Sequence, residues 1–277
     1  MRLATFTLAI AVATSAALVA SGQAPIPVET SDLLTHSPLV TCGANPRPPA
    51  TRSNHARVGT WNIRAARSAS VSAIADELRA MQADVIALQE VDVRVRRTGF
   101  VDEPTALATA LDFQYVFAAA IKWDQGDYGL AVLSRWPLTD VKRYRLDATA
   151  AEEPRIVLEA TICAGGRALH VFNHHADGRV AARDTGFAQL KRIVQARLGG
   201  GLLVLGDFNE PIEGPGIHGL LEAGLVDVGN DHDLGTSGNR RIDYLLADAP
   251  FARRATTAHV WPTDKSDHNA VLADLEW

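Results

Sequence analysis

The sequence predicts an α/β fold, a sandwich of strands and helices, on three observations. Many short apolar segments with strand-like composition are interrupted by a few segments of helical period. Several of these strands are apolar on both faces, so we expect both faces to be covered by other layers. No repeat or low-complexity tract occurs in the 277 residues, of which 47% are hydrophobic and 21% charged, a balance typical of a globular protein.

Apolar periodicity predicts four helices. They are residues 70–81, 104–112, 184–198 and 217–224. In the first of them, Val71, Ile74, Leu78 and Met81 recur at three- and four-residue steps, which places them on one helical face. Glycines follow the third helix and end the fourth, at positions suited to a helix C-terminus.

Nine apolar segments are predicted to be strands. They are residues 57–64, 84–91, 128–135, 155–163, 168–175, 202–209, 241–247, 256–262 and 270–277. Most are short, rich in valine, isoleucine and leucine, and bounded by turn-forming residues. The folded domain is therefore expected to cover residues 57–277.

The first 24 residues have the layout of a secretory signal peptide. Arg2 precedes an apolar run, and small residues follow, with cleavage expected after Gly22 or Ala24. An uncleaved membrane anchor is the alternative, because the run is close to the lower length limit for spanning a bilayer. No later segment is long and apolar enough to cross a membrane. We expect a secreted or periplasmic protein.

Residues 25–56 form a Pro-rich N-terminal arm that contains one of the two cysteines. An even cysteine count in an exported chain predicts a disulfide, here between Cys42 and Cys163. Such a bond would close a loop of roughly 120 residues and stabilise the fold by about 4–5 kcal/mol in the chain-entropy model. Two free thiols are the alternative.

The net charge disfavours a nonspecific binder of polyanions. The 27 basic residues become 26 when Arg2 is removed, against 32 acidic residues, so the mature chain carries a charge of −6. This argument is weak, because a local basic patch can bind phosphate on an acidic protein.

Polar side chains recur where the apolar strands end. They are Asn62, Glu90, Asn173, His175, Asp207, Asn209, Asp243, Asp267 and His268. Strand alternation places Asp207 and Asn209 on one face and Phe208 on the other. Buried charges require partners, so these groups are expected to share one site that holds a hard cation and an anionic substrate.

The residue types favour a magnesium site over a zinc site, a serine nucleophile or a P-loop. Magnesium prefers oxygen ligands and is typically held by one or two carboxylates together with substrate phosphate. The sequence contains no Cys-His cluster of zinc spacing, no Gly-x-Ser-x-Gly elbow and no P-loop.

Seven motifs in order resemble the endonuclease/exonuclease/phosphatase superfamily, the metal-dependent phosphoesterases of the deoxyribonuclease and sphingomyelinase kind. They are "TWNIR", "LQEVD", "YGLAVLSR", "FNHHAD", "GDFNEP", "RIDYLL" and "SDHNAV". Each motif is weak alone, but together they cover residues 57–277. The resemblance implies a four-layer α/β/β/α sandwich, in which two packed β-sheets carry outer helices.

The resemblance also implies roles for eight residues. The metal ligands would be Glu90, Asn62 and Asp267. The catalytic histidine would be His268, with Asp243 as its partner. Asp207 and Asn209 would orient the water and the phosphate, and His175 would donate a hydrogen bond to a phosphate oxygen. The family usually has Thr-His where this chain has His174-His175, and strand parity makes His175 the match. Whether His268 or Asp207 is the formal base, and whether one or two metals bind, stays open.

The expected function is an exported hydrolase that uses Mg²⁺ or Mn²⁺ to cleave a phosphoester, and most readily a phosphodiester, by in-line attack of water. The substrate would be a lipid headgroup, a small phosphodiester or a nucleic acid, and we expect a monomer. A nonspecific secreted endonuclease and a catalytically inactive binding module of the same fold are the alternatives. Loops expected to contact substrate contain Arg94, Arg96, Arg97, Trp123, Tyr128, Arg179, Arg183, Arg240 and Arg241. A solvated charged loop without a role in binding is the alternative for each.

Overall fold

The computed structural model describes residues 26–30, 33–35, 42, 55–148, 153–164, 167–229 and 234–276. The predicted signal peptide, residues 1–24, lies outside the described residues, as does most of the Pro-rich arm. No helix among the described residues reaches the length and apolar character needed to cross a membrane.

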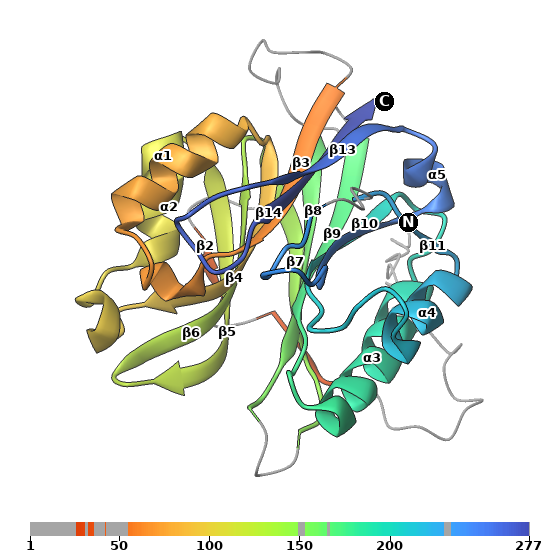
Figure 1. Cartoon of the computed structure of the whole chain (residues 1–277), viewed down its shortest axis with the longest axis horizontal. Coiled ribbons are helices and arrows are strands. Elements are labelled where there is room, and N and C mark those ends of the chain that lie inside the picture. Colours follow the sequence, from red (N-terminus) through yellow and green to blue (C-terminus); the bar gives the residue numbers. More distant parts are fainter. Residues whose placement is uncertain are drawn as a thin grey trace, which may run out of the picture.

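Two seven-stranded sheets pack face to face, with helices on both outer sides (Figure 1). The first sheet contains, in spatial order, β1 (Val28–Glu29), β7 (Leu138–Arg145), β8 (Ile156–Ala164), β9 (Arg167–His175), β10 (Leu202–Asp207), β12 (Asp243–Asp248) and β11 (Leu225–Asp227). The second sheet contains β13 (Ala255–Trp261), β14 (Ala270–Glu276), β3 (His55–Asn62), β4 (Val85–Val93), β6 (Gly126–Ser134), β5 (Gln114–Trp123) and β2 (Leu34–Thr35).

The helices form the two outer layers. The second sheet carries α1 (Val71–Met81) and α2 (Glu103–Leu111), and the first carries α3 (Val180–Gln195) and α4 (Pro215–Glu222). The short α5 (Ala249–Ala252) follows β12, and its Phe251 packs in the core between the sheets. Two short 3₁₀ turns cover Arg64–Ala66 and Arg96–Thr98. The predicted four-layer α/β/β/α sandwich is therefore confirmed.

Three apolar cores separate the four layers. The core between the sheets contains Val58, Val132, Leu158, Leu205 and Leu245. The core under α1 and α2 contains Trp61, Leu78 and Leu88, and the core under α3 and α4 contains Phe172, Leu190 and Phe208. Each sheet thus buries both faces, which explains strands that are apolar on both sides.

The predicted helices form with shifted ends. In α1, Ile74, Leu78 and Met81 are buried, and the Ser70 hydroxyl accepts a hydrogen bond from the Ala73 amide as an N-cap. Helix α3 begins at Val180, one turn before the predicted start, and ends at Gln195, before the three glycines.

Five of the described strands were absent from the sequence prediction, and one of them is β11, at the edge of the first sheet opposite β1. Strands β5 and β7 lie inside the sheets, and β1 and β2 place two short segments of the N-terminal arm at one edge of each sheet. The boundary expected at residue 57 falls inside β3.

Two parallel strand pairs bring the polar strand ends together. Helix α1 connects β3 to the parallel strand β4, and α3 connects β9 to the parallel strand β10. Because the carboxyl ends of parallel strands meet at one edge, Asn62 lies beside Gln89 in the second sheet and His175 lies beside Asp207 in the first. Asp243, at the start of the antiparallel β12, pairs with Asp207 on its other side.

A disulfide joins Cys42 to Cys163 at the end of β8, with their Cα atoms 5.3 Å apart. The predicted pairing is confirmed, and it attaches the N-terminal arm to the first sheet.

Candidate active site

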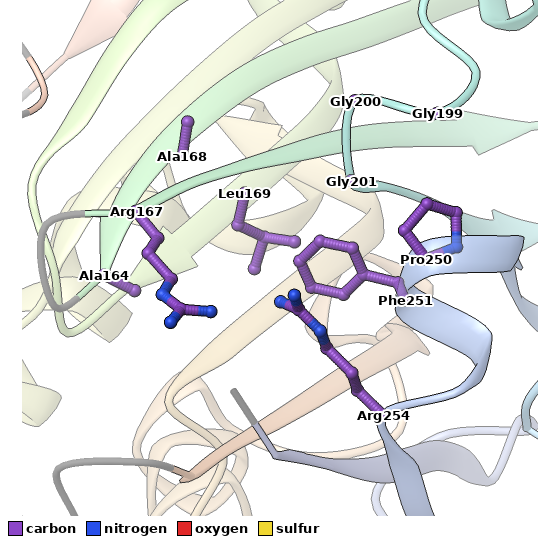
Figure 2. A pocket seen from close by; sticks show the side chains of 10 residues that line it. All are labelled: Ala164, Arg167, Ala168, Leu169, Gly199, Gly200, Gly201, Pro250, Phe251 and Arg254. Carbon is purple, nitrogen blue, oxygen red and sulfur yellow. The ribbon is translucent and has the colours of Figure 1, made fainter.

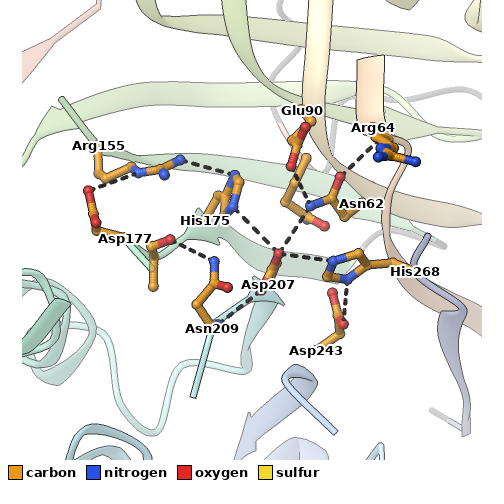
Figure 3. Close-up of polar contacts among 12 residues, drawn as sticks. Asn62, Arg64, Glu90, Arg155, His175, Asp177, Asp207, Asn209, Asp243 and His268 are labelled. Carbon is orange, nitrogen blue, oxygen red and sulfur yellow. Dashed lines mark hydrogen bonds and ion pairs between the residues drawn. The ribbon is translucent and has the colours of Figure 1, made fainter. Parts of the chain in front are cut away.

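The amide of Asn62 connects carboxylates from both sheets in the site (Figure 3). Its Nδ2 atom donates to Glu90 Oε1 at 3.0 Å and to Asp207 Oδ2 at 3.0 Å. Its Oδ1 atom accepts the backbone N–H of Arg64 at 3.0 Å. One buried amide therefore holds β4 and β10 at a defined separation.

Glu90 lies at a bulge in β4. Leu88 pairs with Ala131 and Val91 with Gly129, so β4 has one more residue than β6 across this step. Glu90 adopts φ of 52°, which is uncommon for a residue with a side chain. Such strain persists only where surrounding contacts stabilise it, and it turns the half-buried Glu90 carboxylate toward Asn62.

Asn173 of β9 supplies those contacts from the opposite sheet. Its Nδ2 atom donates to the carbonyl oxygens of Leu88 and Ala131, both at 2.9 Å. Its Oδ1 atom accepts from Gln89 Nε2 at 2.8 Å, and the same nitrogen donates to Thr60 Oγ1 at 3.0 Å. This buried network joins the sheets directly beside the Glu90 bulge.

His268 and Asp243 form a buried pair, with Nδ1 2.9 Å from Oδ2. Burial alone would lower the pKa of His268, but the hydrogen bond and charge of Asp243, together with Asp207 and Asp267, raise that pKa to about 9. The backbone carbonyl of His268 accepts from Trp61 Nε1 at 2.9 Å, which anchors its loop to β3. The imidazole is therefore charged at neutral pH.

Asp207 lies at the centre of the site and is almost completely buried. Its Oδ1 atom accepts the backbone N–H of Asn209 at 2.9 Å, and its Oδ2 atom lies 3.5 Å from Nε2 of His175 and 3.8 Å from Nε2 of His268. Burial and the charge of Asp243 raise the pKa of Asp207. A carboxyl with a raised pKa can exchange a proton more readily near neutral pH.

Asn209 reaches the site by a turn, because β10 ends at Asp207. Its backbone has φ of 49°, and its Nδ2 atom donates to the Ala176 carbonyl at 3.0 Å. Arg183 of α3 donates to the Asn209 carbonyl at 2.7 Å. Phe208 packs in the core under α3 and α4, as strand alternation predicted, but that alternation does not place Asn209.

His175 points into the site and His174 points away from it, as their strand parity predicted. His174 contacts Phe208 at 6.0 Å between ring centroids, on the helix side of the first sheet. His175 lies 3.2 Å from Arg155 through Nδ1. Burial first, and then the charge of Arg155, lower the pKa of His175 well below its ordinary value.

Asp267 lies at the margin of the site. Its Oδ2 atom pairs with Arg64 Nε at 3.1 Å, and its side chain is 48% exposed. The neighbouring Ser266 hydroxyl donates to the Asn62 carbonyl at 2.7 Å, which fixes the chain beside β3. The other seven predicted residues are connected by direct contacts within the site.

The side chains fit a hard divalent cation. The carboxylates of the site outnumber its positive groups, and they are Glu90, Asp207, Asp243 and Asp267. Asp207, Asp243 and His268 each offer a ligand atom within 4.8 Å of the others. A charged His268 bonded to Asp243 is a poor ligand, so Glu90 and the accessible Asp267 suit Mg²⁺ or Mn²⁺ better.

Three charged residues in this region had no role in the sequence prediction. Arg64 and Arg155 contact Asp267 and His175, and Asp177 lies near Arg155. Arg64 and Asp177 lie within two of the seven motifs, "TWNIR" and "FNHHAD", whereas Arg155 begins the predicted strand 155–163 and lies in none of them. Position in a motif was a signal for Arg64 and Asp177, but only the fold shows the partners of all three.

A separate pocket lies at the opposite ends of β9 and β10, away from this site. Its volume is about 210 Å³, and Arg167, Arg254, Phe251 and the loop of Gly199 to Gly201 line it (Figure 2). None of its lining residues belongs to the group around Asp207.

Comparison with known proteins supports one family. The model of the Endonuclease/Exonuclease/phosphatase family matches residues 59–268. The chain is 28% identical over 166 residues to the uncharacterized protein YbhP of Escherichia coli (strain K12), a match that covers 55% of this chain and 64% of that relative. The chain therefore matches less than two thirds of this relative's length.

Solved structures share the fold. An endonuclease/exonuclease/phosphatase from Beutenbergia cavernae has a TM-score of 0.66 and 22% identity, over 80% of this chain and 72% of that chain. A 3'-5' exonuclease from Neisseria meningitidis has a TM-score of 0.62 and 20% identity, over 80% of this chain and 100% of that chain. These structures show the shared fold, and the family match over residues 59–268 shows that the chain belongs to the endonuclease/exonuclease/phosphatase family.

Proposed function

We propose that the protein is an exported phosphoesterase that depends on Mg²⁺ or Mn²⁺ and cleaves a phosphodiester by in-line attack of water. The observation that carries this proposal is the convergence on Asp207 of Asn62 from the second sheet and of two histidines with different partners. Such a group can orient water, donate to phosphate oxygens and transfer a proton at one phosphorus atom.

The protein groups divide the chemistry as follows. Asp207 would orient or deprotonate the attacking water, with the turn at Asn209 holding its carboxylate. His268 would exchange a proton at Nε2, with Asp243 supporting its charged form. His175 would donate a hydrogen bond to a phosphate oxygen.

Glu90 and Asp267, with Asn62 beside Glu90, would hold the cation. The chemistry that a divalent cation supplies there is neutralisation of phosphate oxygens and stabilisation of the leaving oxygen. The bulge at Glu90 supports this role, because it directs a carboxylate into the site at a cost in backbone strain.

The ion pairs of the candidate substrate-contacting arginines favour a modest-sized or lipid-borne substrate. Five of the seven arginines expected to contact substrate have an acidic partner within 4 Å: Arg96, Arg97, Arg179, Arg183 and Arg241. A nuclease that follows a duplex needs several cations free to contact phosphates beyond the scissile one. Arginines that already pair with a carboxylate are less available to contact these additional phosphates.

Export is supported by the N-terminal sequence and by the disulfide. Disulfides persist in oxidising compartments, and the Cys42–Cys163 bond fits a secreted or periplasmic protein.

An activity panel tests the proposal. Wild-type protein and His268→Ala would be assayed on a small phosphodiester, on phospholipid vesicles for headgroup release, and on plasmid DNA at physiological salt. Each assay would be run with magnesium and with chelator. We expect magnesium-dependent turnover of the first two substrates and slow nicking, all lost in His268→Ala.

Two results would overturn parts of this proposal. Rapid nicking that weakens at higher salt and disappears in His268→Ala would identify an endonuclease instead. No turnover of any substrate by folded protein, with Mg²⁺ and with Mn²⁺, would favour an inactive binding module.

A further inference from the structure

We propose that Arg155 is a positioning residue that holds His175 as the neutral tautomer with its proton on Nε2, so that His175 acts only as a hydrogen-bond donor. The use of this donor in catalysis rests on the proposed function. The tautomer itself is a property of the resting protein and can be measured without any reaction.

The contact between Arg155 and His175 determines where the proton lies. Nη1 of Arg155 is 3.2 Å from Nδ1 of His175. A guanidinium has only donors and stays charged in proteins, so Nδ1 has to be the acceptor. A proton on Nδ1 would place N–H against N–H, and a charged imidazole would also place cation against cation. The remaining state has the proton on Nε2.

Arg155 is held in place by its other contacts. Its Nη1 atom pairs with Glu153 Oε1 at 3.0 Å, and its Nε atom lies 3.9 Å from Asp177 Oδ2. Asp177 is fixed in turn by Arg179 at 2.8 Å. The Arg155 side chain is only 17% exposed and immediately precedes β8, the strand that pairs with β9.

The Nε2–H group of His175 then faces the centre of the site. Nε2 lies 3.5 Å from Asp207 Oδ2, the atom that also accepts from Asn62. Figure 3 shows Arg155, His175 and Asp207 following one another into the site. A phosphate bound beside Asp207 would accept a hydrogen bond from Nε2–H of His175, which stays protonated while Arg155 occupies Nδ1.

The two histidines near Asp207 therefore have opposite partners. Nδ1 of His268 faces the carboxylate of Asp243 at 2.9 Å, which requires a proton on Nδ1 and leaves Nε2 able to gain or lose one. Nδ1 of His175 faces a guanidinium, which fixes the proton on Nε2. His268 is thus suited to proton transfer and His175 to steady donation.

The test reads the tautomer by ¹⁵N NMR of histidine-labelled protein without metal. The His175 signals would be assigned by comparison with His175→Gln. In wild-type protein we expect Nε2 protonated and Nδ1 unprotonated. In Arg155→Met we expect that preference to be lost, and in Arg155→Lys we expect it to be partly restored because an ammonium also donates. Arg253→Met, at an exposed arginine that follows α5, is the matched control.

A His175 signal with the proton on Nδ1 in wild-type protein would overturn the inference, whether or not any variant folds. An unchanged Nε2–H tautomer in folded Arg155→Met would overturn it as well. Arg155→Gln provides a second neutral variant if Arg155→Met does not fold.

Kinetics on a small phosphodiester provide a second readout. We expect kcat to fall about 10- to 100-fold in Arg155→Met, as is typical when the orienting partner of a site residue is removed. Arg155→Lys should recover part of that loss. If wild-type protein showed no hydrolysis while His175 kept the expected tautomer, the proposed function would fail and this inference would stand.

Discussion

The Nδ2 atom of Asn62 on β3 lies 3.0 Å from the Oδ2 atom of Asp207 on β10, so a hydrogen bond joins the two sheets at the centre of the candidate site. Neither sheet holds the assigned residues alone. The second sheet and its loops contribute Asn62, Glu90 and His268, and the first contributes His175 and Asp207. Correct packing of the sheets is therefore a condition for activity.

Replacing Glu90 by alanine should abolish activity and weaken the binding of Mn²⁺ by at least about 10-fold. The reason is that Glu90 is the carboxylate that the β4 bulge directs into the site. Phosphodiester hydrolysis measures the loss of activity, and isothermal titration with Mn²⁺ measures the loss of binding. Glu222→Ala, at an exposed position in α4, is the control. Full activity of wild-type protein in chelator would contradict the metal assignment.

Asp243→Asn should lower kcat by about 10- to 100-fold, a smaller loss than that of His268→Ala. An amide at this position carries no charge to stabilise the charged form of His268, and it can turn its NH₂ group instead of its oxygen toward Nδ1–H of His268. The rates are to be compared at equal melting temperature, with Asp76→Asn on the exposed face of α1 as the control. A rate equal to that of wild-type protein would remove Asp243 from the catalytic group.

Asn173→Leu should reduce the free energy of unfolding by about 1–3 kcal/mol. The change removes the donor to the carbonyls of Leu88 and Ala131 and leaves a buried amide hydrogen of Gln89 with one partner fewer. Urea denaturation measures the loss. Activity should fall further than stability explains, because Asn173 holds the bulge at Glu90. Unchanged stability would show that the network does not stabilise the sheet packing.

Glu103 should make stability decrease as pH rises. Burial first, and then the charge of Asp92, raise the pKa of this carboxyl to about 8, against 4.5 in the unfolded chain. Between these values the folded protein binds more protons than the unfolded chain, so the free energy of unfolding falls with increasing pH. Below pH 4.5 the effect vanishes, and above about pH 8 it is complete.

Glu103→Gln removes this titration. The variant should therefore be more stable than wild-type protein at pH 8 by an amount on the order of a few kcal/mol, and the two should differ least at low pH. Urea denaturation across this pH range measures both. Parallel stability curves for the two proteins would contradict a buried, protonated Glu103.

The sequence predicted the four layers of the fold, but it did not predict every strand of the two sheets. Helical periodicity in residues 70–81 identified α1 because its apolar face packs on one sheet. Strand β5 was missed because its alanine-rich centre lacks the bulky residues typical of strands, and β7 because charged residues alternate along it. Both form because neighbouring strands supply partners, which local sequence does not record.

The site was predictable where strand parity decides orientation. His174 and His175 lie on the faces that parity assigned, and Asp207 lies where its strand ends. The left-handed backbone of Glu90 and the turn at Asn209 were not predictable, since both depend on contacts with other segments. The partner of His175, Arg155, immediately precedes the neighbouring strand β8 and is likewise set by the fold.

The most direct test of a single hydrolytic centre is a double-mutant cycle on phosphodiester hydrolysis with magnesium. The kcat values of Asp207→Ala, His268→Ala and the double variant would be compared at equal folding, because a buried charge left unpaired can unfold a protein. If Asp207 and His268 act as one unit, each single variant loses orders of magnitude and the double variant loses no more than the worse single variant. Wild-type rates in either single variant, or losses that simply add in the double variant, would contradict a shared site.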